Sequence, residues 1–181
     1  MTGRIDIIIG CMFSGKSTEM IRRINRSQVI NKKSLIINSN KDTRYGNSVI
    51  STHNLEQVKC LSLSNLSELY DNSDFLDTDL IFIEEAQFFE DLYDFCVNCA
   101  DNFNKHLVLC GLDGDYLRNP FGDILKLIPH AESVTKLNAY CSICNDGTIG
   151  NFTKRIISDT NQTLVGSTEL YRAVCRKHYL N

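Results

Sequence analysis

The sequence contains no apolar run long enough to cross a membrane. A membrane-spanning helix needs about 18 or more consecutive apolar residues, and the apolar run at residues 5–9 is already interrupted by Asp6. Residues 1–6 also lack the apolar stretch and small-residue cleavage site of a secretory signal peptide. We therefore expect a cytoplasmic protein that does not bind a membrane.

An excess of basic residues is also absent. The chain has 19 Lys and Arg residues against 22 Asp and Glu residues, and its net charge is −3. Broad binding to a phosphate backbone depends on basic side chains, so stable binding of nucleic acid is not expected. The hydrophobic content of 43% is ordinary for a packed globular protein.

Fixed-period repeats and low-complexity tracts are missing as well, and short apolar runs alternate with helical patterns instead. Helices are predicted at residues 16–30 and along an apolar stripe at residues 92–103, and a long polar loop at residues 40–54. Strands are predicted at residues 3–9, 34–38, 79–83 and 106–111. Strands that alternate with helices favour an α/β fold with a parallel sheet flanked by helices.

The pattern changes near residue 140. Residues 140–181 contain cysteines and short β-type runs such as residues 162–165, without a convincing long helix. We therefore expect two parts: a nucleotide-binding α/β domain at residues 1–139, and a small zinc-binding lobe at residues 140–181.

A complete phosphate-binding loop, G-x-x-x-x-G-K-[ST], follows the first predicted strand and opens the first predicted helix. Its glycines let backbone N–H groups surround phosphate oxygens, and the positive end of the helix faces the same phosphates. Lys16 is expected to reach the β- and γ-phosphates and Ser17 to bind Mg²⁺. The residues expected to bind ATP here are Gly10, Cys11, Met12, Phe13, Ser14, Gly15, Lys16 and Ser17.

Two carboxylates, Glu84 and Glu85, follow the apolar run at residues 79–83. Ligands of an open parallel sheet bind beyond the carboxyl ends of its strands, where the phosphate-binding loop also lies. The first carboxylate is expected to hold Mg²⁺, and the second can accept a proton from a nucleophile. A solvated strand end is the alternative, which the phosphate-binding loop makes less favourable.

Eight cysteines without an export signal indicate core residues or metal ligands rather than disulfides. Cys141 with Cys144, and Cys175 with His178, form a C-x₂-C and a C-x₂-H pair. Together they complete a tetrahedral site without an open position, so structural Zn²⁺ is predicted.

The other cysteine pattern is interpreted as core. Cys96 and Cys99 have the same C-x₂-C spacing but lie within the apolar helical stripe, and free cysteine packs as a small hydrophobe. Cys60 and Cys110 lie in apolar strand-like runs and are interpreted in the same way.

The phosphate-binding loop, acidic strand end and zinc pairs occur in an order that resembles the zinc-containing thymidine kinases of the cellular and poxviral type. The resemblance extends over nearly the whole chain. The segments that carry it are residues 12–19, 22–23, 41–45, 52–53, 85–89, 112–114 and 120–121. It implies transfer of the γ-phosphate of ATP to the 5′-hydroxyl of thymidine, with deoxyuridine as a further acceptor, by a homotetramer in nucleotide salvage.

The resemblance also implies residue roles. Glu85 is the general base and acts with Lys16 and Arg44, while Asp42 and Arg44 arrange the phosphates and the 5′ end. A segment that the zinc holds closes over the base. The residues implied to bind thymidine are Met12, Gln87, Phe88, Leu112, Tyr116, Phe121, Leu164, Val165, Gly166 and Tyr171.

Three departures from the family pattern are visible. Glu84 replaces the usual Asp, Cys11 replaces a frequent Pro, and Asp115 and Tyr116 stand where Thr and Phe are common. Cys11 lies beside a helix N-terminus, a position that lowers the pKa of a thiol. We therefore expect Cys11 to be reactive.

Other functional classes fit less well. Residues 84–87 faintly resemble the acidic box of a nucleic-acid-dependent ATPase, but the acidic net charge and the short length oppose that interpretation. Residues 40–43 place Asp one position too early for a guanine-reading N-K-x-D motif. A non-catalytic zinc module would leave the complete phosphate-binding loop unexplained.

Overall fold

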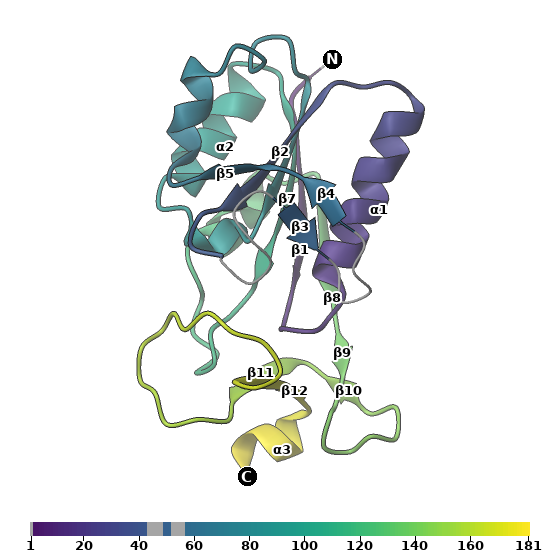
Figure 1. Cartoon of the computed structure of the whole chain (residues 1–181), viewed down its shortest axis with the longest axis vertical. Coiled ribbons are helices and arrows are strands. Elements are labelled where there is room, and N and C mark those ends of the chain that lie inside the picture. The colour runs from purple at the N-terminus through teal and green to yellow at the C-terminus, as the bar shows by residue number, and fades with distance from the viewer. Residues whose placement is uncertain (1, 43–48, 52–56) are drawn as a thin grey trace.

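The computed structural model describes residues 2–42, 49–51 and 57–181. Its centre is a six-stranded parallel sheet with the strand order β5-β2-β6-β7-β1-β8 (Figure 1). The strands are β1 (Arg4–Gly10), β2 (Ser34–Ser39), β5 (Leu61–Leu63), β6 (Leu80–Glu84), β7 (His106–Leu112) and β8 (Ser133–Leu137). Segments that connect parallel strands must cross over the sheet and cover its faces, so the predicted α/β fold is confirmed.

The two faces of the sheet carry separate apolar clusters, because successive side chains of a strand point to opposite sides. In β1, Ile7 and Ile9 belong to one cluster and Ile8 to the other. The Ile8 side packs against Met20 and Ile24 of α1 (Lys16–Val29). The opposite side packs against α2 (Leu92–Asp101), η1 (Leu66–Asp71) and η3 (Ile124–His130), and Figure 1 shows α1 and α2 on opposite sides of the sheet.

The rest of the chain forms smaller elements. β3 (Val49–Ser51) pairs with β4 (Gln57–Lys59), and η2 (Ala86–Phe88) follows β6. Beyond β8 lie β9 (Ala139–Tyr140), β10 (Ile149–Gly150), β11 (Phe152–Arg155), β12 (Tyr171–Val174) and α3 (Arg176–Leu180). Figure 1 shows this C-terminal part beyond the end of the sheet at which β1 leads into α1. Within the described ranges, no helix has the length and apolar character that a membrane span requires.

Most predicted elements are confirmed, with ends that differ by at most two residues. The prediction of a β-type run at residues 162–165 is wrong, because these residues lie in the connection between β11 and β12. Cys96, Cys99 and Cys110 are buried in the core as expected, whereas Cys60 is only half-buried between β4 and β5. The long polar loop predicted at residues 40–54 is wrong at residues 49–51, which form β3, while its residues 43–48 and 52–54 lie outside the described residues.

A buried carboxylate stabilises the amino-terminal edge of the sheet, away from the carboxyl ends of the strands. Asp6 in β1 is 6% exposed. Arg4 donates two hydrogen bonds of 2.9 Å to it, Ser133 donates one of 2.5 Å, and the His106 Nε2 atom lies 2.7 Å from its Oδ2 atom. Burial opposes ionisation, but these partners outweigh it and hold the pKa of Asp6 well below its usual value. The cluster joins β1, β7 and β8.

We expect Asp6→Asn to lower the free energy of unfolding by about 1.5–3 kcal/mol at neutral pH, because hydrogen bonds to a charged group are lost. A carboxyl whose folded pKa is depressed stabilises above its unfolded pKa and loses that contribution as pH falls through the folded value. The difference in the free energy of unfolding between the variant and the parent should therefore shrink below about pH 4. Urea unfolding at a series of pH values measures this difference, and Asp77→Asn, at an exposed position, is the control. A loss of stability in Asp6→Asn that does not depend on pH would contradict a stabilising role of the ionised Asp6 carboxylate.

Candidate active site and zinc centre

The loop between β1 and α1 has the backbone shape that its glycines allow. Gly15 adopts a left-handed conformation with φ 81°, which a residue with a Cβ adopts at a cost. Lys16 is the first residue of α1 and is buried, and its Nζ atom donates a 2.9 Å hydrogen bond to the carbonyl of Cys11. The positive end of α1 and this ammonium group together favour an anion at the loop.

Glu84, the last residue of β6, lies next to the start of α1. The Ser17 hydroxyl donates a hydrogen bond to its Oε1 atom, while its Oε2 atom is buried without a hydrogen-bond partner in the part of the chain that the structure describes. Burial, and then the charge of Glu85, raise the pKa of Glu84. A hydroxyl beside a buried carboxylate oxygen fits the oxygen ligands that Mg²⁺ prefers, and a cation there would favour the ionised carboxylate.

Glu85 is held in an unusual backbone conformation. Its φ of 49° is left-handed, which is uncommon for a residue other than glycine and occurs frequently at functional sites. The Gln87 side chain donates a 2.5 Å hydrogen bond to the Glu85 carboxylate and accepts one of 3.0 Å from the Leu112 backbone N–H. Gln87 therefore links the Glu85 carboxylate to the end of β7.

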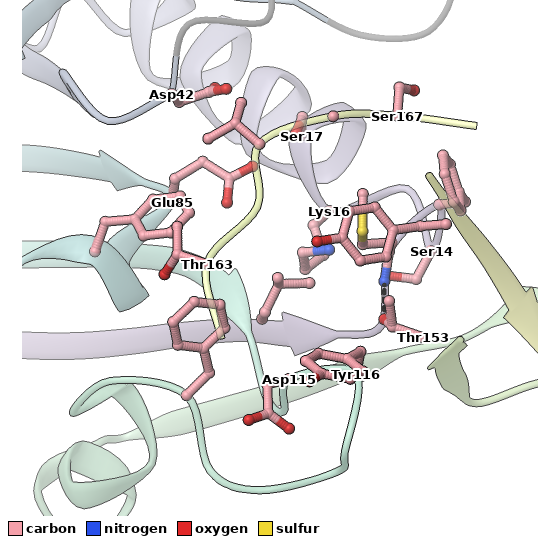
Figure 2. A pocket seen from close by; sticks show the side chains of 18 of the residues that line it. Ser14, Lys16, Ser17, Asp42, Glu85, Asp115, Tyr116, Thr153, Thr163 and Ser167 are labelled. Atoms are coloured by element: carbon pink, nitrogen blue, oxygen red, sulfur yellow. Dashed lines mark hydrogen bonds between the residues drawn. The ribbon is translucent and has the colours of Figure 1, made fainter. Parts of the chain in front are cut away.

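A single cavity joins these groups. Figure 2 shows Lys16 and Glu85 in it, with Asp115 and Tyr116 along its lower border. Phe88 and Phe121 form an edge-to-face pair with ring centroids 5.6 Å apart, which gives the cavity an aromatic wall. The cavity is also bordered by Leu164, Val165, Gly166 and Tyr171.

The cavity brings together most residues that the sequence predicts. From the phosphate-binding loop, it is lined by Met12, Phe13, Ser14, Gly15, Lys16 and Ser17, and from the predicted thymidine set by Met12, Phe88, Leu112, Tyr116, Phe121, Leu164, Val165, Gly166 and Tyr171. Asp42, Glu84 and Glu85 also line it. Gly10, Cys11 and Gln87 are not among the lining residues, and Arg44 falls outside the described residues.

Three further lining residues carry no signal in the linear sequence. Thr153 in β11 accepts a 3.0 Å hydrogen bond from the Met12 backbone N–H, as Figure 2 shows. Arg155, two residues later, is buried beside Tyr116. Asn38 at the end of β2 donates a 3.2 Å hydrogen bond to Asp42. The contacts of Thr153 and Arg155 join segments far apart in the chain, so spacing alone could not reveal them.

The predicted zinc ligands meet in space. The Nδ1 atom of His178 lies 3.5 Å from the sulfur of Cys141 and 3.4 Å from those of Cys144 and Cys175. All four ligand atoms lie within 4.8 Å of one another. Zinc–sulfur bonds of about 2.3 Å in a tetrahedron separate neighbouring ligands by about 3.7 Å, so this group fits Zn²⁺. The predicted ligand set is confirmed as a cluster that could hold the metal.

Comparison with known proteins agrees with this arrangement. The family model described as thymidine kinase matches residues 3–179. The chain belongs to the thymidine kinase family. It is 43% identical to a thymidine kinase of Oryza sativa subsp. japonica, over 99% of this chain and 67% of that protein. It is 44% identical to the thymidine kinase of Yaba monkey tumor virus, over 98% and 95% of the two chains, and 39% identical to the cytosolic thymidine kinase of Gallus gallus, over 98% and 77%.

One expectation for this thymidine kinase family member is wrong. Cys11 is 2% exposed, and its thiol donates a 3.3 Å hydrogen bond to the carbonyl of Gly150 in β10. Burial raises the pKa of the Cys11 thiol, which disfavours the reactive thiolate that the sequence predicts. Tertiary packing against the C-terminal part outweighs the effect of the nearby helix N-terminus.

We expect Cys144→Ser to lose bound zinc and to increase hydrogen exchange throughout residues 140–181, because structural zinc sites contribute directly to folding. Cys60→Ser is the matched control, since Cys60 lies outside the cluster. Metal analysis and hydrogen exchange measure both variants. A zinc-free parent protein, purified without chelator and with normal protection of these residues, would contradict the prediction.

Proposed function

We propose that this chain transfers the γ-phosphate of ATP to the 5′-hydroxyl of thymidine, for nucleotide salvage. One observation carries the proposal: the phosphate-binding loop, the acidic end of β6 and an aromatic wall line the same cavity. Membership of the thymidine kinase family supports it. A nucleic-acid-dependent ATPase would need no such aromatic wall beside its phosphate site.

The reaction requires four events at this cavity. The loop backbone and Lys16 bind the β- and γ-phosphates, and Glu85 accepts the proton of the 5′-hydroxyl. The 5′-oxygen then forms a bond to the γ-phosphorus, and the bond to the β,γ-bridging oxygen breaks, which releases ADP. Ser17 and Glu84 would hold Mg²⁺, which when bound would supply positive charge against the phosphates. We further propose that Asp42 and Arg44 help to arrange the phosphates and the 5′ end.

The base compartment suits a flat, partly apolar ring. Phe88 and Phe121 offer faces and edges for stacking, and Met12 and Leu112 add apolar surface. Residues 164–166 border the same space, and we propose that their backbone groups pair with the polar edge of thymine, which is costly to bury unpaired. We also propose that Gln87 contacts the deoxyribose region, where it donates a hydrogen bond to the Glu85 carboxylate.

Several wider properties belong to the same proposal. We place the boundary between the α/β domain and the zinc lobe at residue 140, and we assign Zn²⁺ a structural role because its four ligands leave no open position. A cytoplasmic location and a homotetramer are proposed by resemblance. Deoxyuridine is proposed as a second acceptor because it lacks only the methyl group of thymidine.

Measuring ADP release with thymidine, with deoxyuridine, with single-stranded DNA and without an acceptor tests the proposed activity. We expect ADP release only when thymidine or deoxyuridine is present, together with formation of the nucleoside 5′-monophosphate. Stimulation by single-stranded DNA without nucleoside phosphorylation would replace the proposal with an ATPase.

Replacing Glu85 tests the general base. Glu85→Gln preserves shape but cannot accept a proton, so kcat should fall by about 10²–10⁴-fold while ATP affinity stays nearly unchanged. Glu90→Gln is the control, because its side chain is 90% exposed outside the cavity. Steady-state kinetics and ATP titration measure both variants, and near-normal turnover of Glu85→Gln would reject this role.

Replacing Glu84 tests the magnesium site. Glu84→Asp shortens the side chain, so we expect activity with an altered Mg²⁺ requirement. Glu84→Ala should fold but lose most transfer, because the carboxylate beside Ser17 is removed. Titrations of activity with Mg²⁺ and Mn²⁺ compare the three proteins. If Glu84→Ala keeps normal turnover and an unchanged metal profile, another acid must serve the metal, with Asp113 the first to test.

A further inference from the structure

The segment that borders the nucleoside cavity has no helix or strand of its own. Residues 156–170, here called the cover loop, connect β11 to β12. Gln162, Thr163, Leu164 and Val165 of this loop line the cavity. A connection of this length loses considerable conformational entropy when it takes one shape, so specific contacts must hold it in place.

One set of contacts shapes the cover loop from within. The buried Arg155 guanidinium donates hydrogen bonds to the carbonyls of Asp159, Asn161 and Gln162, at 2.9, 2.6 and 3.2 Å. It also donates one of 2.8 Å to the Tyr171 hydroxyl, which in turn donates to the carbonyl of Leu164. These groups all belong to the β11–β12 hairpin. They set the form of the loop but do not attach it to the sheet.

A second set reaches across the cavity to the connection that follows β7. The Gln162 side chain donates a 3.0 Å hydrogen bond to the Oδ2 atom of Asp115. The Tyr116 hydroxyl donates one of 3.3 Å to the carbonyl of Thr160, and the Tyr116 ring lies against Arg155, with 3.8 Å between the guanidinium carbon and the ring centroid. In Figure 1 the loop between β11 and β12 curls beside the connection after β7.

Asp115 is fixed before it meets the cover loop. Its Oδ1 atom accepts hydrogen bonds from the backbone N–H groups of Leu117 and Asn119, at 2.8 and 2.9 Å, and the residue is 5% exposed. Oδ2 is thereby aimed at Gln162. The Tyr179 hydroxyl, beside the zinc ligand His178, donates a 2.8 Å hydrogen bond to the carbonyl of Tyr116 and supports the same connection.

From this geometry we infer that the Asp115–Gln162 pair is a latch that fastens the cover loop across the nucleoside cavity and sets nucleoside affinity. Asp115 is then a positioning residue, which acts on the nucleoside through Gln162 and the loop. A loop already ordered before binding loses less entropy when the nucleoside enters, so affinity rises. The kinetic part of this inference rests on the proposed thymidine kinase activity.

An exchange of hydrogen-bonding groups tests the latch. Gln162→Glu places a second carboxylate against Asp115, so the pair loses its donor and repels. We expect the KM for thymidine to rise about tenfold, with kcat and the KM for ATP changed less than about twofold. Adding Asp115→Asn restores a donor, now on the other side, while the remaining amide oxygen can still accept from Leu117 and Asn119. The double variant should return to within about threefold of the parent KM.

Ser158→Asp is the matched control. It adds the same charge to the cover loop at an exposed position outside the cavity, and it should leave the KM for thymidine unchanged. An unchanged KM in Gln162→Glu overturns the latch. A double variant that remains as weak as Gln162→Glu also overturns it, because Asp115→Asn restores a hydrogen-bond donor to the pair and should re-form the contact.

Hydrogen exchange separates this inference from the proposed activity. Without nucleoside, the amides of residues 156–170 should exchange faster in Gln162→Glu than in the parent, and the double variant should recover the protection. Equal exchange in all three proteins overturns the latch, whatever the activity. If the parent phosphorylates no thymidine but the exchange pattern appears, the proposed function fails and the latch stands.

Discussion

The parallel pairing of β6, β7 and β1 is the constraint on which the candidate site depends. Within the sheet, Ile83 pairs with Leu109 and Gly10 with Leu112, so the carboxyl ends of these strands meet at one edge. The phosphate-binding loop, the Glu84–Glu85 pair and the connection after β7 all leave the sheet there. Apolar packing on both faces fixes the register, because a shift by one residue would turn buried side chains toward the wrong face.

The C-terminal part is built against that same edge. The Cys11 thiol donates a hydrogen bond to the carbonyl of Gly150, and the Met12 N–H donates one to Thr153. The phosphate-binding loop is therefore in contact with β10 and β11. The Lys154 ammonium donates a 2.8 Å hydrogen bond to the carbonyl of His178. A metal that ordered the cysteine cluster would therefore act on the geometry of both the phosphate and the nucleoside compartments, although the cluster itself lies outside the cavity.

Polar groups are satisfied very differently at the two ends of the sheet. Asp6 has several partners, and the buried Lys105 ammonium donates to the carbonyls of Phe75 and Thr78. In contrast, the buried side-chain atoms without a partner, over the described ranges, belong to Ser14, Glu84 and Arg155, which all line the cavity. Unpaired buried groups are costly, and their restriction to the cavity is what a site shaped for polar and charged ligands would show.

The sequence by itself determined the α/β fold, the phosphate-binding loop, the acidic strand end and the four residues of the zinc cluster. These features depend on local periodicity or on short spacings, which the chain displays directly. Only the tertiary structure decided that Cys11 is buried, that residues 162–165 form a loop rather than a strand, and that Asp115 meets Gln162 across the cavity. Such contacts join distant segments whose approach is set by packing of the whole chain, and no local pattern records them.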